Sequence, residues 1–304
     1  MSPPRRADGP PRSDDAQLEA DRQRGIQRFI AWRRGEGTRQ YANVAAENEA
    51  LVEQLFKETG DLDRIADDLF VRAPELLKMA RFIAGPPLSE DDLHTLADGN
   101  LSLRRPQPEI ATRAAEVIAA LRDPTRFPWL GEKRAATPSE RMAAIRATVA
   151  LATTERVRTL WRNESSARQQ QSAREALRAA GFAEAPRVAK VDTLDQIPRG
   201  SFMQEVQLDG AKCDMPVRLR DGRLLALECK VSNSSLNSVK RLLRETGGKA
   251  RAWHNAFGQT VLTGAVLAGV YKLMHLKEAQ DDYDVAIFWE HDLAPLQEFV
   301  RSVR

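Results

Sequence analysis

Residues 214–230 of the chain read DMPVRLRDGRLLALECK, and this pattern predicts a β-hairpin. A turn signal, RDG, separates a short apolar-polar run from the apolar run LLAL, as is typical of two strands joined by a tight loop. Side chains alternate between the two faces of a strand, so Glu228 and Lys230 project from the same face. An acid and a lysine are therefore expected side by side on a half-buried hairpin.

The length of the turn decides whether Asp214 joins this pair. A two-residue loop, DG, would place Asp214 opposite Cys229 and would point its carboxylate away from Glu228. A three-residue loop, RDG, with its glycine in the left-handed region, would place Asp214 opposite Glu228. Only the three-residue register assembles two carboxylates and the ammonium of Lys230 on one surface.

Two carboxylates and a lysine in this arrangement suit the hydrolysis of phosphodiesters. Asp214 and Glu228 are candidate ligands of a divalent cation, together with the backbone carbonyl of Cys229 and with water. Such a cation activates a bound water and offsets charge on the phosphate, while Lys230 positions the water and stabilises the same charge. The expected cofactor is Mg²⁺, and Mn²⁺ is expected to substitute for it.

The two cysteines test the same register. If Asp214 lies opposite Glu228, then Cys213 lies opposite Cys229, on the face turned away from the carboxylates. Both thiols are then expected to be buried, close to each other and reduced. If the register is different, the next candidates for the first metal ligand are Asp209 and Glu205.

The motif resembles a known superfamily of nucleases. Asp214, thirteen intervening residues and then Glu228-Cys229-Lys230 in a strand are similar to the PD-(D/E)XK pattern, although the proline follows the aspartate by two positions and does not precede it. Longer stretches resemble the XamI family of type II restriction endonucleases, from about residue 30 onward. These stretches are PELLKMARFIAGPPLSEDDL (74–93), LRDGRLLALECKVSNSSLNSVKRLLRETG (219–247), VLAGVYKLMHL (266–276) and FWEHDL (288–293).

The resemblance implies a Mg²⁺-dependent type II restriction endonuclease that cuts double-stranded DNA at a short palindrome. It assigns Asp214 and Glu228 as metal-binding acids and Lys230 as the catalytic lysine. Many members use a further acid on the helix before the sheet, and Glu164 is the candidate here; its alternative role is a surface pair with Arg168. A homodimer matching the two-fold symmetry of the DNA and a cognate DNA methyltransferase are the expected partners. The site GTCGAC is expected only if specificity follows the namesake of the family.

The segment after the motif predicts a second surface for DNA. SLNSVKRLLRET (235–246) is expected to form a helix that buries Leu236, Val239 and Leu243. Cap-forming side chains and exposed N–H groups at its start favour a phosphate, and its basic face favours the DNA backbone. The candidate DNA-binding residues are Ser232, Asn233, Ser234, Ser235, Asn237, Lys240, Arg241 and Arg244.

The rest of the chain predicts helices followed by a mixed sheet. Apolar residues recur at helical spacing from residue 26 to about residue 130, and TPSE at residues 137–140 is a capping box that opens a long helix ending near Gly181. Short strand patterns follow. The expected fold is α/β (α+β), with a mixed central sheet flanked by helices in a restriction-endonuclease-like core and an N-terminal helical subdomain. The predicted boundaries are 1–24 for a disordered tail, 25–135 for the helical subdomain and 136–304 for the nuclease core.

Charge and motif content limit the alternatives. The net charge is +3, but the positive charge is concentrated in two segments. From Lys133 to Arg178 there are ten basic and four acidic residues, and from Lys230 to Arg251 there are six basic residues and one acidic residue, Glu245. Such local positive charge fits a surface that meets DNA. A repair or junction-resolving nuclease of the same superfamily and a non-catalytic DNA-binding module therefore remain open.

Several classes of protein are disfavoured. The sequence contains no GxxxxGK[ST] motif, which argues against an ATP-driven enzyme. No apolar run approaches the roughly 20 residues of a membrane span, and the amino terminus lacks the apolar core of a signal peptide. A cytoplasmic protein without membrane contact is expected.

Overall fold

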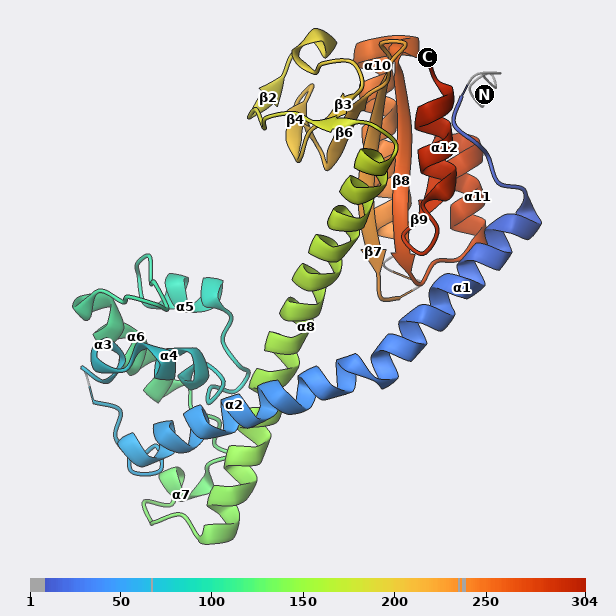
Figure 1. Ribbon diagram of the computed structural model, residues 1–304. Coiled ribbons are helices and arrows are strands. Elements are labelled where there is room, and N and C mark those ends of the chain that lie inside the picture. Colours follow the sequence, from blue (N-terminus) through green and yellow to red (C-terminus); the bar gives the residue numbers. More distant parts are fainter. Residues whose placement is uncertain (1–8, 67, 235, 237–238) are drawn as a thin grey trace. The chain divides into compact units, whose positions relative to one another are not determined.

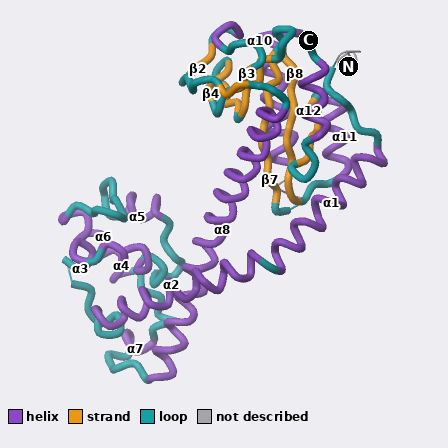
Figure 2. The backbone as a smooth tube through the Cα atoms, in the orientation of Figure 1, coloured by secondary structure: helices purple, strands orange, loops and turns teal. Residues whose placement is uncertain are grey.

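The structure is a computed structural model that describes residues 9–66, 68–234, 236 and 239–304 (Figure 1). It divides into two compact units: unit 1 combines residues up to 34 with residues 161–304, and unit 2 comprises residues 35–160. All the strands drawn in orange belong to unit 1, and unit 2 consists of helices and loops (Figure 2). The predicted mixed α/β fold with an N-terminal helical region is confirmed.

Unit 2 is a helical bundle with one apolar core. Its helices are α2 (Glu36–Glu58), α3 (Leu69–Arg72), α4 (Pro74–Ala80), α5 (Glu90–Leu96), α6 (Pro108–Ala120), α7 (Pro128–Gly131) and the first half of α8 (Pro138–Ala179). The amphipathic faces of these helices bury Phe56, Phe70, Phe127 and Trp129 in a single cluster.

Helix α8 begins at the predicted capping box and runs from unit 2 into unit 1. The amide of Thr137 donates to Glu140 Oε2 at 2.9 Å, and the amide of Glu140 donates to Thr137 Oγ1 at 3.3 Å. The helix ends at Ala179, just before Gly181, which adopts a φ of +83°. Among the described helices, none joins the length to the apolar composition that crossing a membrane requires.

The amino-terminal region differs from the prediction. Helix α1 (Asp15–Arg34) is ordered, so the prediction of disorder up to residue 24 is wrong for residues 15–24. The reason is that Leu18 is buried against α11 (Leu273–Asp282), while Lys277 donates to Asp15 at 2.6 Å. Residues 1–8 lie outside the described residues. The unit boundaries after residues 34 and 160 also differ from those predicted.

Unit 1 is built on a six-stranded mixed sheet. The strand order is β1 (Ala183–Glu184), β3 (Ser201–Phe202), β6 (Met215–Arg218), β7 (Leu224–Ser232), β8 (Val261–Gly269) and β9 (Val285–Trp289). Strands β7, β8 and β9 are parallel and lie side by side in Figure 1, whereas β6 is antiparallel to β7. Strands β7 and β8 are buried along almost their whole length, as expected of central strands that are covered on both faces.

Different helices cover the two faces of this sheet. The end of α8 and α12 (Ala294–Ser302) pack on the face that carries Leu225 and Leu227. The opposite face meets the π-helix η2 (Val239–Gly247), α10 (Gly248–Phe257) and α11. A small sheet of β2 (Lys190–Val191), β4 (Val206–Leu208) and β5 (Ala211–Cys213) packs beside α10, where Trp253 Nε1 donates to the Leu208 carbonyl at 2.9 Å. Short 3₁₀ turns, Leu194–Gln196 and Gly258–Thr260, complete the unit.

The helix predicted at residues 235–246 is a π-helix from Val239 onward. Leu236, expected to be buried, is 78% exposed, while Leu242 and Leu243 are both buried. A π-helix has more residues per turn than an α-helix, so the buried side chains no longer follow the 3.6-residue spacing. The predicted stripe of Leu236, Val239 and Leu243 is therefore wrong at its first position.

Candidate active site

The hairpin of β6 and β7 adopts the three-residue register. Met215 lies opposite Leu227, and the loop RDG ends at Gly222 with a φ of +96°. This register brings Asp214 beside Glu228, and the amide of Asp214 donates to Glu228 Oε1 at 3.3 Å. The prediction that these two carboxylates lie together is confirmed.

The three predicted catalytic side chains meet at this point of the sheet. Lys230 Nζ lies 2.9 Å from Asp214 Oδ2 and 2.7 Å from Glu228 Oε2. The amide of Cys229 donates to Asp214 Oδ2 at 2.8 Å. Because the N–H and C=O of one strand residue point to the same edge, the carbonyl of Cys229 also faces the side of Asp214.

A fourth side chain, Lys249 of α10, completes the cluster. Its Nζ lies 2.8 Å from Glu228 Oε2, the same oxygen that contacts Lys230. The side chain of Glu228 is completely buried, whereas that of Lys249 is 23% exposed. Sequence reasoning missed Lys249, because nothing in its spacing distinguishes it from the other bases of a basic segment. Only the packing of α10 against the sheet brings it to Glu228.

The environment of Lys230 keeps its side chain charged. Burial is the largest single influence on the pKa of Lys230 and lowers it, but the attraction of Asp214 and Glu228 together outweighs burial and raises the pKa above its ordinary value. The backbone of Lys230 is also held, since its carbonyl accepts hydrogen bonds from Tyr271 Oη at 2.7 Å and Gln169 Nε2 at 3.3 Å. Lys230 is therefore a well-fixed ammonium.

The donor set fits a hard divalent cation. Asp214 Oδ2 and Glu228 Oε2 both contact the ammonium of Lys230, so the two oxygens face a common point, as two ligands of one cation must. No group of three or more His, Cys, Asp or Glu side chains placed to hold a metal occurs within the described ranges. A cation here would complete its shell with the Cys229 carbonyl and water.

Asp214 and Lys230 open into a cavity of ≈ 470 Å³. The other acids that line it are Glu205, the alternative first ligand, and Glu245 of η2. Glu164, the predicted further acid, is exposed on α8 and is not among the residues that line this cavity. Its predicted neighbour Arg168 donates to Glu290 at 2.8 Å.

The predicted DNA-binding residues have different positions in the structure. Asn233, Lys240 and Arg241 line this cavity, whereas Ser234 and the exposed Arg244 are not part of its lining. Ser232 is fully buried and its hydroxyl donates to the carbonyl of Ser234 at 2.8 Å, so the structure does not present Ser232 for a DNA contact. Ser235 and Asn237 lie outside the described residues.

The two cysteines are buried and free, but they do not lie together. Cys229 packs with Leu227 on one face of β7, whereas Cys213 packs with Ala226 on the other. The predicted register is right, but β6 begins only after Asp214, and the preceding strand β5 turns into the small sheet. Burial raises the pKa of both thiols, in keeping with structural roles. The predicted proximity of the cysteines is wrong.

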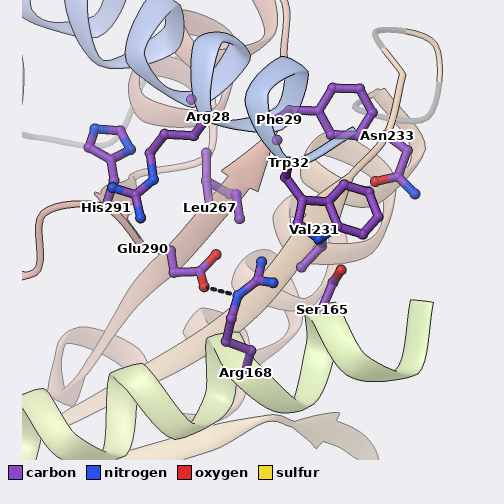
Figure 3. Close-up of a pocket in the computed structure, with 13 residues that line it drawn as sticks. Arg28, Phe29, Trp32, Ser165, Arg168, Val231, Asn233, Leu267, Glu290 and His291 are labelled. Carbon is purple, nitrogen blue, oxygen red and sulfur yellow. Dashed lines mark hydrogen bonds and ion pairs between the residues drawn. The ribbon is translucent and has the colours of Figure 1, made fainter. Parts of the chain in front are cut away.

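A second cavity of ≈ 280 Å³ adjoins the one that Asp214 and Lys230 open into, and the two share Val231 and Asn233. Phe29 and Trp32 of α1 line one side of it, and the ion pair of Arg168 and Glu290 lies on the other (Figure 3). Aromatic rings and a guanidinium are the groups that contact bases in proteins that bind nucleic acids.

Comparison with known proteins adds an independent finding. A family model described as XamI restriction endonuclease matches residues 60–289, a range that includes Asp214, Glu228, Lys230 and Lys249. The type II restriction enzyme XamI of Xanthomonas campestris pv. amaranthicola is 40% identical over 214 residues, which cover 68% of this chain and 78% of that protein. No solved structure matches the chain.

Proposed function

The chain belongs to the XamI restriction endonuclease family, and we propose that it cleaves DNA at the cavity into which Asp214 and Lys230 open, beside the buried Glu228. The family consists of type II restriction endonucleases, so the protein is a site-specific endonuclease acting on DNA. The observation that supports this location is the meeting of two carboxylates at one ammonium, with separations of 2.9 and 2.7 Å.

Type II restriction enzymes generally use a divalent metal ion, and we propose Mg²⁺ here, with Mn²⁺ able to substitute. Asp214, Glu228 and the carbonyl of Cys229 would hold it. When bound, such an ion lowers the pKa of a water ligand and offsets charge on the scissile phosphate. The amide of Cys229 orients Asp214, and the ammonium of Lys230 donates to the attacking water and to a phosphate oxygen.

The basic residues around the cavity supply the proposed DNA contacts. Asn233 and Lys240 are exposed and line the cavity, so each can reach a phosphate next to the scissile one. Arg241 also lines it, while donating to the carbonyl of Val231. Glu205, which lines the cavity, suits the role of an additional acid better than Glu164 does.

The second cavity extends this proposed surface. Trp32 offers a half-buried ring beside Asn233, and a ring in that place can contact a sugar or base of the strand being cut. Trp32→Ala is therefore expected to weaken DNA binding in Ca²⁺ several-fold. Trp129→Phe, in the core of unit 2, provides the matched aromatic control.

The decisive experiment incubates the protein with unmethylated phage DNA and with a duplex containing GTCGAC, in Mg²⁺. Discrete fragments support site-specific cleavage, a smear indicates a non-specific nuclease, and intact DNA with a gel shift indicates a binding module. Changing Asp214, Glu228 or Lys230 to Ala should abolish cleavage, and Lys230→Ala, which keeps both proposed metal ligands, should leave specific binding in Ca²⁺ largely intact. Lys277→Ala, which removes a lysine paired only with Asp15 among the described residues, should cleave normally. Cleavage at the wild-type rate by Lys230→Ala would refute the assignment.

Cutting both strands of a palindrome with one site per chain is most simply done by a two-fold dimer. We therefore propose that two chains bind one duplex, and that a methyltransferase with the same specificity protects the host DNA. The mass of the complex in solution, measured by light scattering, tests the first point. One chain per duplex with concerted double-strand cleavage would contradict it.

A further inference from the structure

The two lysines of the site meet one carboxylate oxygen. Lys230 Nζ and Lys249 Nζ lie 2.7 and 2.8 Å from Glu228 Oε2, and the other oxygen, Oε1, accepts the amide of Asp214. Glu228 Oε2 is therefore the oxygen at which a bound cation would compete with both ammonium groups. The four charges, two negative and two positive, also cancel, so the site is neutral as it stands.

The two lysines differ in their freedom to move. Lys230 contacts both carboxylates, and hydrogen bonds from Tyr271 and Gln169 hold its carbonyl. Lys249, by contrast, forms an ion pair with Glu228 alone among the described residues, and its side chain is 23% exposed. Lys249 is therefore the lysine that can leave Glu228 for water at the lower cost.

We propose that Lys249 is a positioning residue for Glu228, a resident counter-ion that occupies Oε2 until a divalent cation replaces it. This inference rests on the proposed function. Lys249 holds the buried carboxylate in place before the metal arrives, and its competition weakens metal binding to the free protein. Removing its charge should therefore strengthen metal binding, the opposite of what the loss of a merely supporting residue would do.

The same arrangement couples the metal to DNA. With a divalent cation bound and both lysines still charged, the cluster carries a net charge of two positive units in a largely buried place. A phosphate of the DNA offsets that charge, so DNA should tighten metal binding and the metal should tighten DNA binding by the same factor. Lys249 contributes one of the two positive units, and its neutralisation should make this coupling smaller.

The experiment measures Ca²⁺ binding by titration calorimetry on the full chain, with and without a duplex that the wild type cleaves in Mg²⁺. Lys249→Met and Lys249→Gln should bind Ca²⁺ at least about tenfold more tightly than the wild type without DNA, because one repelling charge is gone. Lys249→Arg and Lys277→Met should resemble the wild type, because the first keeps the charge and the second removes a distant one.

Three outcomes overturn the inference. The first is unchanged or weaker Ca²⁺ binding by Lys249→Gln. This variant keeps a hydrogen-bond donor to Glu228, so it can be measured even if Lys249→Met does not fold. Loss of stability in both variants without tighter Ca²⁺ binding shows a structural role only. If the wild type binds Ca²⁺ with equal affinity with and without DNA, the proposed coupling between metal binding and DNA binding is wrong. Glu228→Gln separates the two levels of proposal: if it binds Ca²⁺ like the wild type, the proposed metal site itself is wrong.

Discussion

Replacing Glu228 by Gln removes the charge of a fully buried carboxylate, keeps its volume and leaves two ammonium groups facing a neutral amide. Removing one partner of a buried ion pair generally costs about 3–5 kcal/mol. Here Lys230 keeps Asp214 at 2.9 Å, and Lys249 is partly exposed, so we expect a cost of about 2–3 kcal/mol.

The partner substitution sharpens the expectation. Lys249→Met leaves Glu228 paired with Lys230 at 2.7 Å, so its cost should be about 1–2 kcal/mol. In the double variant, Gln faces Met and no unpaired ammonium of Lys249 remains. The double variant should therefore be more stable than the sum of the two single effects predicts, by about 1–2 kcal/mol.

Native-state hydrogen exchange of peptides that cover β7 measures this locally, because exchange reports the free energy of opening that strand. Lys277→Met combined with Glu228→Gln is the control, and its two effects should add, since Lys277 pairs with Asp15. Additivity of the Glu228 and Lys249 substitutions within about 0.5 kcal/mol would refute the argument that the two charges support each other in the folded protein.

Three further predictions concern residues outside the cluster. The variant in which both Cys213 and Cys229 are replaced by Ala should still cleave DNA, and its free energy of unfolding, measured in urea, should fall by about 1–3 kcal/mol. The effects of the two single substitutions should add, because the thiols lie in different apolar clusters. Gly222→Ala should lower the free energy of unfolding by about 1–3 kcal/mol, because Gly222 has a φ of +96°. Gly248→Ala is the control and should not destabilise the protein, because Gly248 lies in a helix with open space at its Cβ position. Equal stability of the two variants would contradict the turn argument. Burial is the largest influence on the pKa of His291 and, together with the charges of Arg24 and Arg28, lowers it below its ordinary 6.5 despite Asp21. The unfolded chain therefore binds the proton more readily, and the stability due to His291 should be lost as pH falls below about 6.5. Thermal unfolding between pH 8 and pH 5.5 should be less pH-dependent in His291→Asn, and identical profiles would contradict this.

Much of the hairpin of β6 and β7 could be predicted from local sequence. The turn RDG permits few conformations, because a glycine follows two polar residues and can take a positive φ, as Gly222 does. Once the turn is set, the two-residue period of a strand places Asp214, Glu228 and Lys230 on one face. The start of α8 was predictable for a similar reason, since the hydrogen bonds of its capping box join residues only three apart in the chain.

The sequence by itself thus predicted the hairpin of β6 and β7 with two possible registers, the catalytic candidates that cluster in one of them, and the helical character of unit 2, all of which depend on neighbours in the chain. The structure then showed that the three-residue turn is the one adopted. Only the tertiary structure decided that Lys249 reaches Glu228, that Cys213 turns away from Cys229, and that Leu236 is exposed. Each of these depends on how a helix or a second sheet packs against the central strands. Periodicity reports which face a side chain is on, but it does not report what covers that face.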